Sequence, residues 1–290
     1  MKKEENESFE KSWQTRSEAF YTHWTRSEPE NQIQLAFRNH WSLFHELMGD
    51  PRFNGGKRSL EVGCGRGSLS CYFADAGFDC TLLDLSAPVI DIARNIFSQN
   101  GLSANFDVGD AENLPYESGS FDVVFSIGLL EHFEDPAKVL AEQVRILAPG
   151  GLFLGYVVPE YHGQNVQKEY AWINEILDGY WQAGTEAPPP KEVLFRSDEG
   201  SPRYLKILEE LGLDGLEASG VYPVPMISHS IDFPFSLMPK ASELAWVKRI
   251  QELLTANGER TGRHPWLCEE GFGNAFLLWG YRPTGNTESK

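Results

Sequence analysis

Three glycines at alternate positions are the feature of this sequence with the clearest chemical meaning. Gly63, Gly65 and Gly67 follow an apolar stretch and precede a helical pattern, in the segment SLEVGCGRG. Because glycine has no side chain, the backbone amides of such a loop can approach a ligand closely at the start of a helix. The spacing also suits a purely structural turn between a strand and a helix, so the surrounding residues must decide its meaning.

An acidic residue, Asp84, closes the next apolar stretch in TLLDLS. It follows the glycines at a distance typical of a βαβ crossover, where a carboxylate can accept both hydroxyl hydrogens of a ribose. The alternative role is a helix cap, for which Ser86 is better suited. The glycine loop and Asp84 together therefore favour a ligand that carries a ribose.

Two further motifs follow in order. The first is GDAE at residues 109–112, and the second is FDVVFSIGLLEHF at residues 121–133. With these four motifs the chain resembles the class I S-adenosylmethionine-dependent methyltransferases, in particular the small-molecule branch that includes ubiquinone and menaquinone methyltransferase-like enzymes. The resemblance covers about residues 58–159. It implies an α/β fold with a doubly wound, Rossmann-like sheet of seven strands, the last antiparallel, together with an N-terminal helical lid and cap insertions.

The resemblance also implies S-adenosyl-L-methionine as the cofactor. Glu61 is expected to hold the glycine loop, Asp110 to bond the adenine amino group, and the Ala111 amide to bond a ring nitrogen. The full set of expected cofactor-binding residues is Glu61, Gly63, Cys64, Gly65, Gly67, Asp84, Leu85, Asp110, Ala111, Glu112, Ser126 and Ile127. A nicotinamide-binding Rossmann protein is the main rival, but its G-x-G-x-x-G fingerprint places the third glycine one residue later than Gly67.

His132 is the first candidate for a catalytic group. The methyl group of a sulfonium is already electrophilic, so the enzyme must chiefly align an acceptor lone pair with the methyl–sulfur bond. An acceptor that must lose a proton needs a base, and histidine titrates near neutrality. His132 could instead line the pocket or cap a loop, and Glu131 could contact the acceptor or cap the next helix.

Other candidate acceptor contacts lie outside the four motifs. Tyr21, His23 and Trp24 belong to an N-terminal segment that in the family commonly folds over the cofactor, and we expect Tyr21 to act as a lid residue with a catalytic role. Tyr161 and His162 follow the fifth strand at its carboxyl end, the edge where open α/β sheets bind ligands. The roles of His229 and His264 stay open, and ordinary packing is the alternative for all of these residues.

The elements that must position these residues can be read from the apolar spacing. Helical spacing at Ile33–Met48 predicts an amphipathic helix. Strands and helices then alternate, as in a parallel doubly wound sheet. The expected strands are Ser59–Val62, Cys80–Asp84, Ala104–Val108, Phe121–Ser126, Leu152–Val158, Leu216–Val221 and Phe276–Tyr281, and the expected helices are Leu69–Ala76, Ala87–Gln99, Pro136–Leu147, Pro202–Leu211 and Ala241–Ala256. Pro149, Gly150 and Gly151 are expected to end a helix and form a tight turn. Three parts result: a lid segment at 1–57, a cofactor-binding core at 58–159, and a cap with the C-terminal strands at 160–290.

Composition restricts the partners. The formal net charge of -17 opposes a nucleic-acid substrate. The start of the chain resembles no signal peptide and no apolar run reaches the length of a membrane span, so a cytoplasmic protein is expected. Four cysteines without C-x-x-C spacing predict neither a disulfide framework nor a metal site.

The acceptor is where the sequence leaves alternatives open. Oxygen, nitrogen and sulfur acceptors use the same fold, and a thiol or thioether would need little help to attack a sulfonium. A cofactor-binding regulator without turnover is the alternative from another class of protein. A homodimer is an open alternative to a monomer.

Overall fold

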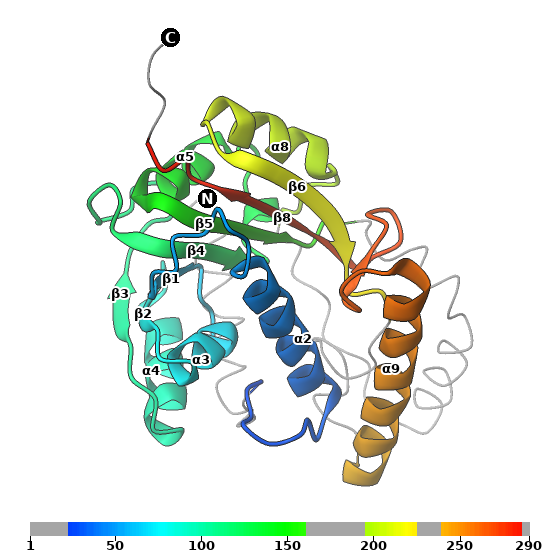
Figure 1. Ribbon diagram of the computed structural model, residues 1–290. Coiled ribbons are helices and arrows are strands. Elements are labelled where there is room, and N and C mark those ends of the chain that lie inside the picture. The colour runs from blue at the N-terminus through cyan, green and yellow to red at the C-terminus, as the bar shows by residue number, and fades with distance from the viewer. Residues whose placement is uncertain (1–22, 161–194, 225–238, 286–290) are drawn as a thin grey trace.

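The computed structural model describes residues 23–160, 195–224 and 239–285. Within these residues one mixed sheet lies between helices on both of its faces (Figure 1). The strands are β1 (Arg58–Val62), β2 (Asp79–Asp84), β3 (Asn105–Val108), β4 (Phe121–Ile127), β5 (Leu147–Val157), β6 (Asp214–Val221), β7 (Leu267–Cys268) and β8 (Ala275–Tyr281). The helices are α2 (Gln32–Leu47), α3 (Ser68–Asp75), α4 (Ala87–Gln99), the short 3-10 turn η1 (Leu130–His132), α5 (Ala137–Ile146), α8 (Ser201–Glu210) and α9 (Lys240–Thr261).

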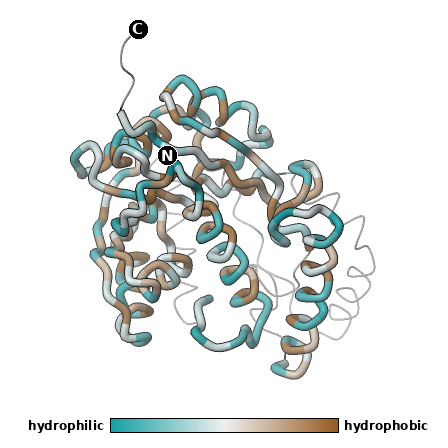
Figure 2. The backbone as a smooth tube through the Cα atoms, in the orientation of Figure 1, coloured by the Kyte–Doolittle hydropathy of each residue, from teal (hydrophilic) through white to brown (hydrophobic). Residues whose placement is uncertain are grey.

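The alternation of side chains along the central strands builds two apolar layers. Val123 and Phe125 of β4 pack with α2, α3 and α4, whereas Val124 between them packs with α5 and α8. All three are completely buried. Because the central strands are packed on both faces, their residues are mostly hydrophobic, whereas the helices carry both hydrophobic and polar residues (Figure 2).

The strand order is β3-β2-β1-β4-β5-β8-β6-β7. The first five strands are parallel, and β8 inserts between β5 and β6 antiparallel to both. This confirms the doubly wound sheet and its antiparallel last strand. The described residues add an eighth strand to the expected seven, because Leu267 and Cys268 pair with the edge of β6. A strand of two residues is too short for a sequence pattern to indicate it.

The turn expected at Pro149–Gly151 is wrong. These residues lie inside β5, which begins at Leu147 where it pairs with Phe121, before the register shifts and Leu152 pairs with Val123. Gly150 supplies the positive φ of 72° at this irregularity. Proline and glycine therefore mark a bulge in a strand and not the end of a helix.

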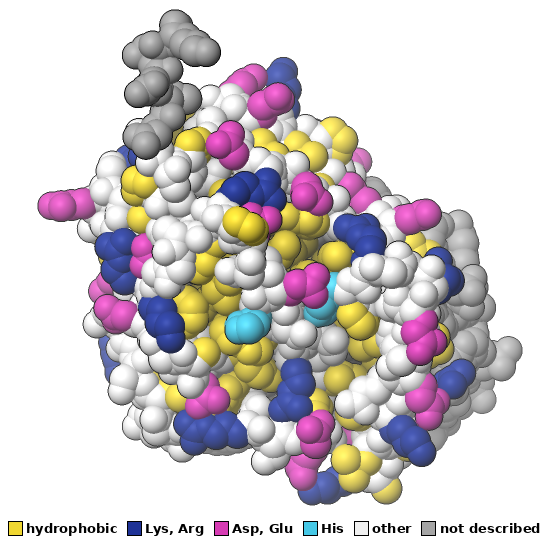
Figure 3. Space-filling model, in the orientation of Figure 1, with side chains coloured by type: hydrophobic (Ala, Val, Ile, Leu, Met, Phe, Trp, Pro, Cys, Tyr) yellow, Lys and Arg dark blue, Asp and Glu magenta, His cyan; other side chains and the backbone are white. Residues whose placement is uncertain are grey.

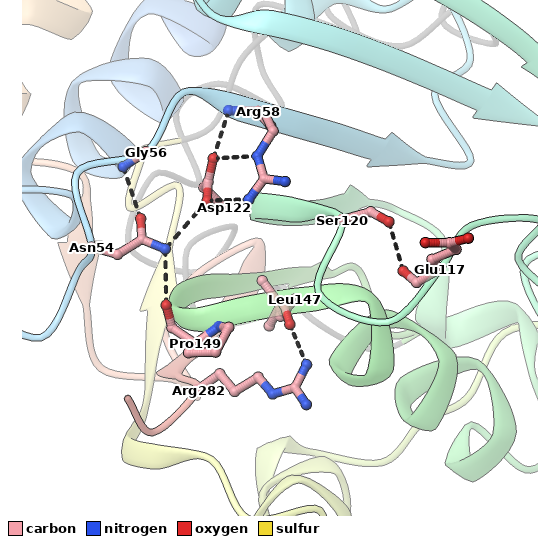
Figure 4. A network of polar contacts seen from close by, with 9 residues as sticks. All are labelled: Asn54, Gly56, Arg58, Glu117, Ser120, Asp122, Leu147, Pro149 and Arg282. Atoms are coloured by element: carbon pink, nitrogen blue, oxygen red, sulfur yellow. Dashed lines mark hydrogen bonds and ion pairs between the residues drawn. The ribbon is translucent and has the colours of Figure 1, made fainter. Parts of the chain in front are cut away.

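The amino ends of β1 and β4 are joined by a polar network (Figure 4). Asp122 accepts bonds from both the backbone and the guanidinium of Arg58, with Nη2 to Oδ1 at 2.8 Å, and a further bond from Asn54. Burial alone would raise the pKa of Asp122, but the bonds from Arg58 and Asn54 hold it below its usual value. Gly56 passes so close that a Cβ there would lie 2.1 Å from Asp122 Cγ. This network stabilises the sheet at the edge opposite the carboxyl ends of the strands.

Helix α2 forms as expected and connects to the C-terminal part of the chain. Asn31 caps it, because its Oδ1 accepts the amide of Gln34 at 2.9 Å. His40 accepts a bond from the indole of Trp266 at 3.0 Å, and burial lowers the pKa of His40 to about 3. His264 bonds Ser42 and the amide of Trp266. These two histidines therefore attach α2 to the segment before β7.

The surface gives no sign of a strongly basic face in the view of Figure 3, where lysine and arginine side chains are scattered among acidic ones. No helix in the described part of the chain combines the length and the apolar character that crossing a membrane requires.

Candidate active site

The glycine loop between β1 and α3 adopts a conformation that favours glycine at all three positions. Gly63, Gly65 and Gly67 have φ values of 67°, 51° and 66°, in the left-handed region where other residues are strained. The amides of Gly63 and Cys64 both donate to the carbonyl of Leu83, at 2.8 and 3.0 Å. A Cβ on Gly67 would come within 2.3 Å of Leu82. The loop is thus shaped by β2, and any side chain on Gly67 would push the two elements apart.

Asp84 lies at the carboxyl end of β2 and bonds the loop directly. Its Oδ2 accepts the amide of Gly65 at 3.0 Å, and its Oδ1 accepts the amide of Ser86 at 3.1 Å. A carboxylate oxygen has two lone pairs, so each keeps one for a ligand. Ser86 occupies the N-cap position of α4, as its residue type suggests, although its hydroxyl makes no side-chain cap bond.

Glu61 fastens the loop from the other side. Its carboxylate accepts the hydroxyl of Ser70 at 2.5 Å and the amide of the same residue at 3.2 Å. Glu61 is almost fully buried, and this burial raises its pKa to about 8. The side chain joins β1 to the first turn of α3 and holds the glycines between them.

The end of β3 lies beside the end of β2, since Asp84 pairs with Val108. Asp110 is exposed there, and its Oδ1 accepts the amide of Glu112 at 2.9 Å. Among the described residues, Leu85 and Val108 are two of the few large apolar side chains that are exposed, at 43% and 55%. An apolar surface flanked by an acidic residue suits a flat heteroaromatic base. Val108 is a part of this surface that was not among the predicted site residues.

The end of β4 contributes buried polar groups that lack partners. The hydroxyl of Ser126 and both carboxylate oxygens of Glu131 are buried without a hydrogen bond among the described residues. Burial raises the pKa of Glu131 to about 7. Ile127 and Gly128 stand between them, half-buried, and Gly128 has a φ of 66°. Buried polar atoms without partners are rare in native proteins, so these oxygens are candidates to bond a ligand.

His132 is held in one orientation by a backbone carbonyl. Its Nδ1 donates to the carbonyl of Phe195 at 2.8 Å, so in the neutral ring Nε2 carries the lone pair. Burial lowers the pKa of His132, the bond to Phe195 opposes that shift, and the charge of Arg196 adds to it. The ring is therefore neutral at neutral pH, with Nε2 available to accept a proton.

The structure places His23 and Trp24, the two described N-terminal candidates, at different ends of α3. His23 Nδ1 lies 2.8 Å from the hydroxyl of Ser68, directly after the glycine loop. Trp24 is buried against Tyr72 and lines an open hollow of about 440 Å³ beside Asp75, at the other end of α3. His23 is thus brought to the site and Trp24 is not. Tyr21, Tyr161, His162 and His229 lie outside the described residues.

Residues 195–201 contribute contacts that the sequence does not predict. The amide of Ser197 donates to the carbonyl of Glu131 at 2.8 Å, next to the bond between Phe195 and His132. Arg203, at the start of α8, pairs with Glu199 of this segment at 3.1 Å. Any residue can bond through its backbone, so the residue types of this segment could not have predicted these contacts.

Comparisons with known proteins agree with this geometry. Residues 60–155 match the family model described as a methyltransferase domain. This segment is a class I S-adenosylmethionine-dependent methyltransferase domain, and a domain of this class uses S-adenosylmethionine. The positive-φ glycines, the free lone pairs of Asp84 and the unpartnered Ser126 fit that cofactor. No group of three metal-binding side chains occurs among the described residues.

Two curated methyltransferases are similar to this chain over part of their length. The chain is 40% identical over 97 residues to norajmaline N-methyltransferase of Rauvolfia serpentina, which covers 32% of this chain and 33% of that protein. It is 38% identical over 96 residues to a ubiquinone biosynthesis O-methyltransferase of Coxiella burnetii, covering 33% and 41%. The similarity thus spans only about a third to two fifths of these relatives.

A solved structure covers nearly the whole chain. An S-adenosylmethionine-dependent methyltransferase of Thermotoga maritima superposes with a TM-score of 0.53 and 18% identity, over 94% of this chain and 98% of that one. At this identity the likeness confirms the Rossmann-like methyltransferase fold.

Proposed function

We propose that this protein transfers the methyl group of S-adenosylmethionine to a nitrogen or oxygen of a small-molecule acceptor, with His132 as the general base. The observation that carries the proposal is the bond from His132 Nδ1 to the Phe195 carbonyl, which leaves Nε2 unprotonated beside the end of β4. The two relatives whose names specify an N- and an O-methyltransferase support nitrogen and oxygen as acceptor atoms.

The cofactor would be held by three groups already in place. Asp84 would accept the ribose hydroxyls, Leu85 and Val108 would flank the adenine, and Asp110 with the Ala111 amide would bond its edge. The glycine loop, which includes the buried Cys64, would lie along the methionine part. When bound, S-adenosylmethionine supplies an electrophilic methyl group on a sulfonium, whose sulfur becomes neutral once the acceptor has taken the methyl.

The protein's own part in the reaction is to orient the acceptor and to remove its proton. His132 Nε2 would take the proton of an oxygen or nitrogen as that atom's lone pair bonds to the methyl carbon. Glu131, buried without a partner next to His132, would accept a hydrogen bond from the acceptor. His23, held at Ser68, would border the methyl group from the lid side. Tyr21, Tyr161 and His162 stay proposed acceptor contacts.

Substitution of His132 tests the proposal. Purified protein is incubated with methyl-tritiated S-adenosylmethionine and a panel of amines, phenols and cell metabolites, and S-adenosylhomocysteine is quantified. His132→Asn keeps a donor near the Phe195 carbonyl but has no basic nitrogen, and it should lose about 10²- to 10⁴-fold in kcat. His132→Ala should lose at least as much.

Cofactor affinity separates a base from a structural residue. Both variants should bind S-adenosylmethionine as tightly as the wild type, and His45→Ala, an exposed histidine on α2, should retain full activity. A His132→Asn variant with a normal rate would eliminate the base role. Cofactor binding without any S-adenosylhomocysteine across the panel would favour the regulator instead.

A further inference from the structure

A short segment lies across the turn η1, which carries Glu131 and His132, and its backbone atoms bond both of these residues. We name residues 195–201 the strap. Its Phe195 carbonyl accepts His132 Nδ1, and its Ser197 amide donates to the carbonyl of Glu131. The carbonyl of Ser197 in turn accepts the amide of Glu160 at 3.1 Å, beyond the end of β5. The strap thus holds η1 against the carboxyl end of the sheet.

The far end of the strap is fixed by a side chain from a distant part of the chain. Glu270, in the turn between β7 and β8, accepts the amide of Ser201 at 2.7 Å and its hydroxyl at 2.6 Å. The approach is close, since a Cβ on Gly200 would lie 2.9 Å from Glu270 Oε1. Ser201 is buried, so two charge-assisted bonds in a sheltered place fix this end.

Because the strap is bonded both to η1 and to Glu270, the Glu270 end can affect the orientation of His132. Only three residues lie between Ser197, which is bonded to Glu131 of η1, and Ser201, which is bonded to Glu270. A carbonyl can only accept, so its position decides which nitrogen of His132 carries the proton. We propose that Glu270 is a positioning residue for methyl transfer, which holds the strap so that the Phe195 carbonyl keeps His132 with Nε2 unprotonated. This inference rests on the proposed base role of His132.

A purely structural role is the alternative that the test must separate. A carboxylate at the first residue of α8 also stabilises that helix through its N-terminal amides and its dipole. Such a role would lower the thermal stability of a variant and leave the imidazole unchanged. A positioning role would alter the tautomer and the pKa of one particular histidine.

The experiment compares neighbouring glutamates in the same turn. Glu270→Ala removes both bonds, Glu270→Gln keeps one acceptor oxygen, and Glu269→Ala is the matched control with the same change in charge and an exposed side chain. Nitrogen NMR of ¹⁵N-histidine-labelled full-length protein reports the tautomer and pKa, with the His132 signals assigned by their loss in His132→Asn. The pH dependence of kcat/KM and the affinity for S-adenosylmethionine are measured on the same samples.

We expect Glu270→Ala to move the proton of His132 partly to Nε2 and to raise its pKa toward the ordinary value, since released burial outweighs the lost bond. The sign follows from burial being the main cause of the lowered pKa. The acidic limb of kcat/KM should move to higher pH, with kcat about ten- to a hundredfold lower and cofactor affinity unchanged. Glu270→Gln should lie in between, and it remains measurable if the alanine variant does not fold.

Two results would overturn the inference, and they differ in what else they affect. An unchanged His132 tautomer and pKa in both Glu270 variants would refute the strap's role while leaving the base role intact. A changed tautomer with normal methylation would refute the role of Glu270 in methylation together with the base role of His132.

Discussion

Asp84 offers the sharpest test of the cofactor site, because the structure sets how many bonds it has left. Each carboxylate oxygen already accepts one backbone amide, from Gly65 or from Ser86, and keeps one lone pair for a ribose hydroxyl. A hydrogen bond to a charged group contributes about 1.5–3 kcal/mol. Two such bonds amount to roughly 3–6 kcal/mol, and 1.4 kcal/mol corresponds to a tenfold change in Kd.

Calorimetric titration with S-adenosylmethionine would measure the effect. Asp84→Ala should weaken binding by about 10²- to 10⁴-fold, and Asp84→Asn, which keeps one acceptor oxygen, by about ten- to a hundredfold. The control is Asp91→Asn, an aspartate of α4 that is 68% exposed and paired with Arg94. A Kd for Asp84→Ala within twofold of the wild type, in a variant that unfolds normally, would refute the ribose contact.

Two further predictions concern stability. Burial raises the pKa of Glu61 from 4.5 to about 8, so its contribution to stability is complete below pH 4.5 and is lost as pH rises through 8. Urea unfolding from pH 5 to 9 should show a smaller decline with pH for Glu61→Gln, and parallel curves would contradict this. Gly56→Ala should displace the Asp122–Arg58 pair and cost about 1–3 kcal/mol of unfolding free energy with unchanged cofactor affinity; wild-type stability would show that the pair can move freely.

The sequence predicted the parallel part of the fold well because its physical signals are local. Apolar runs punctuated by glycines identify β1, β2 and β4 and the helices after them, since each element buries its own side chains. The bulge at Gly150 was misread, because proline and glycine end helices more often than they interrupt strands. The two-residue strand β7 depends on a partner, β6, from a distant part of the chain, and no local pattern can show that.

The candidate site, like the fold, could be predicted only where the signal lies in the residue types themselves. The glycine loop and Asp84 were found because their residue types are themselves the chemical signal. The positions of His23 and Trp24 could not be told apart, since both occur in one aromatic segment and only packing sends His23 to Ser68. The partner of His132 is a backbone carbonyl, which every residue possesses, so the sequence holds no trace of it.

The insertion of β8 between β5 and β6 has a consequence for how the molecule comes together during synthesis. Every parallel strand can form while the ribosome is still adding the C-terminal third, but β5 then keeps one edge open until residues 275–281 emerge. Pairing Leu152 with Tyr281 requires a long loop closure. An open edge on a central strand is a template for association between nascent chains, so we expect the interval before β8 is complete to be when the protein depends most on chaperones.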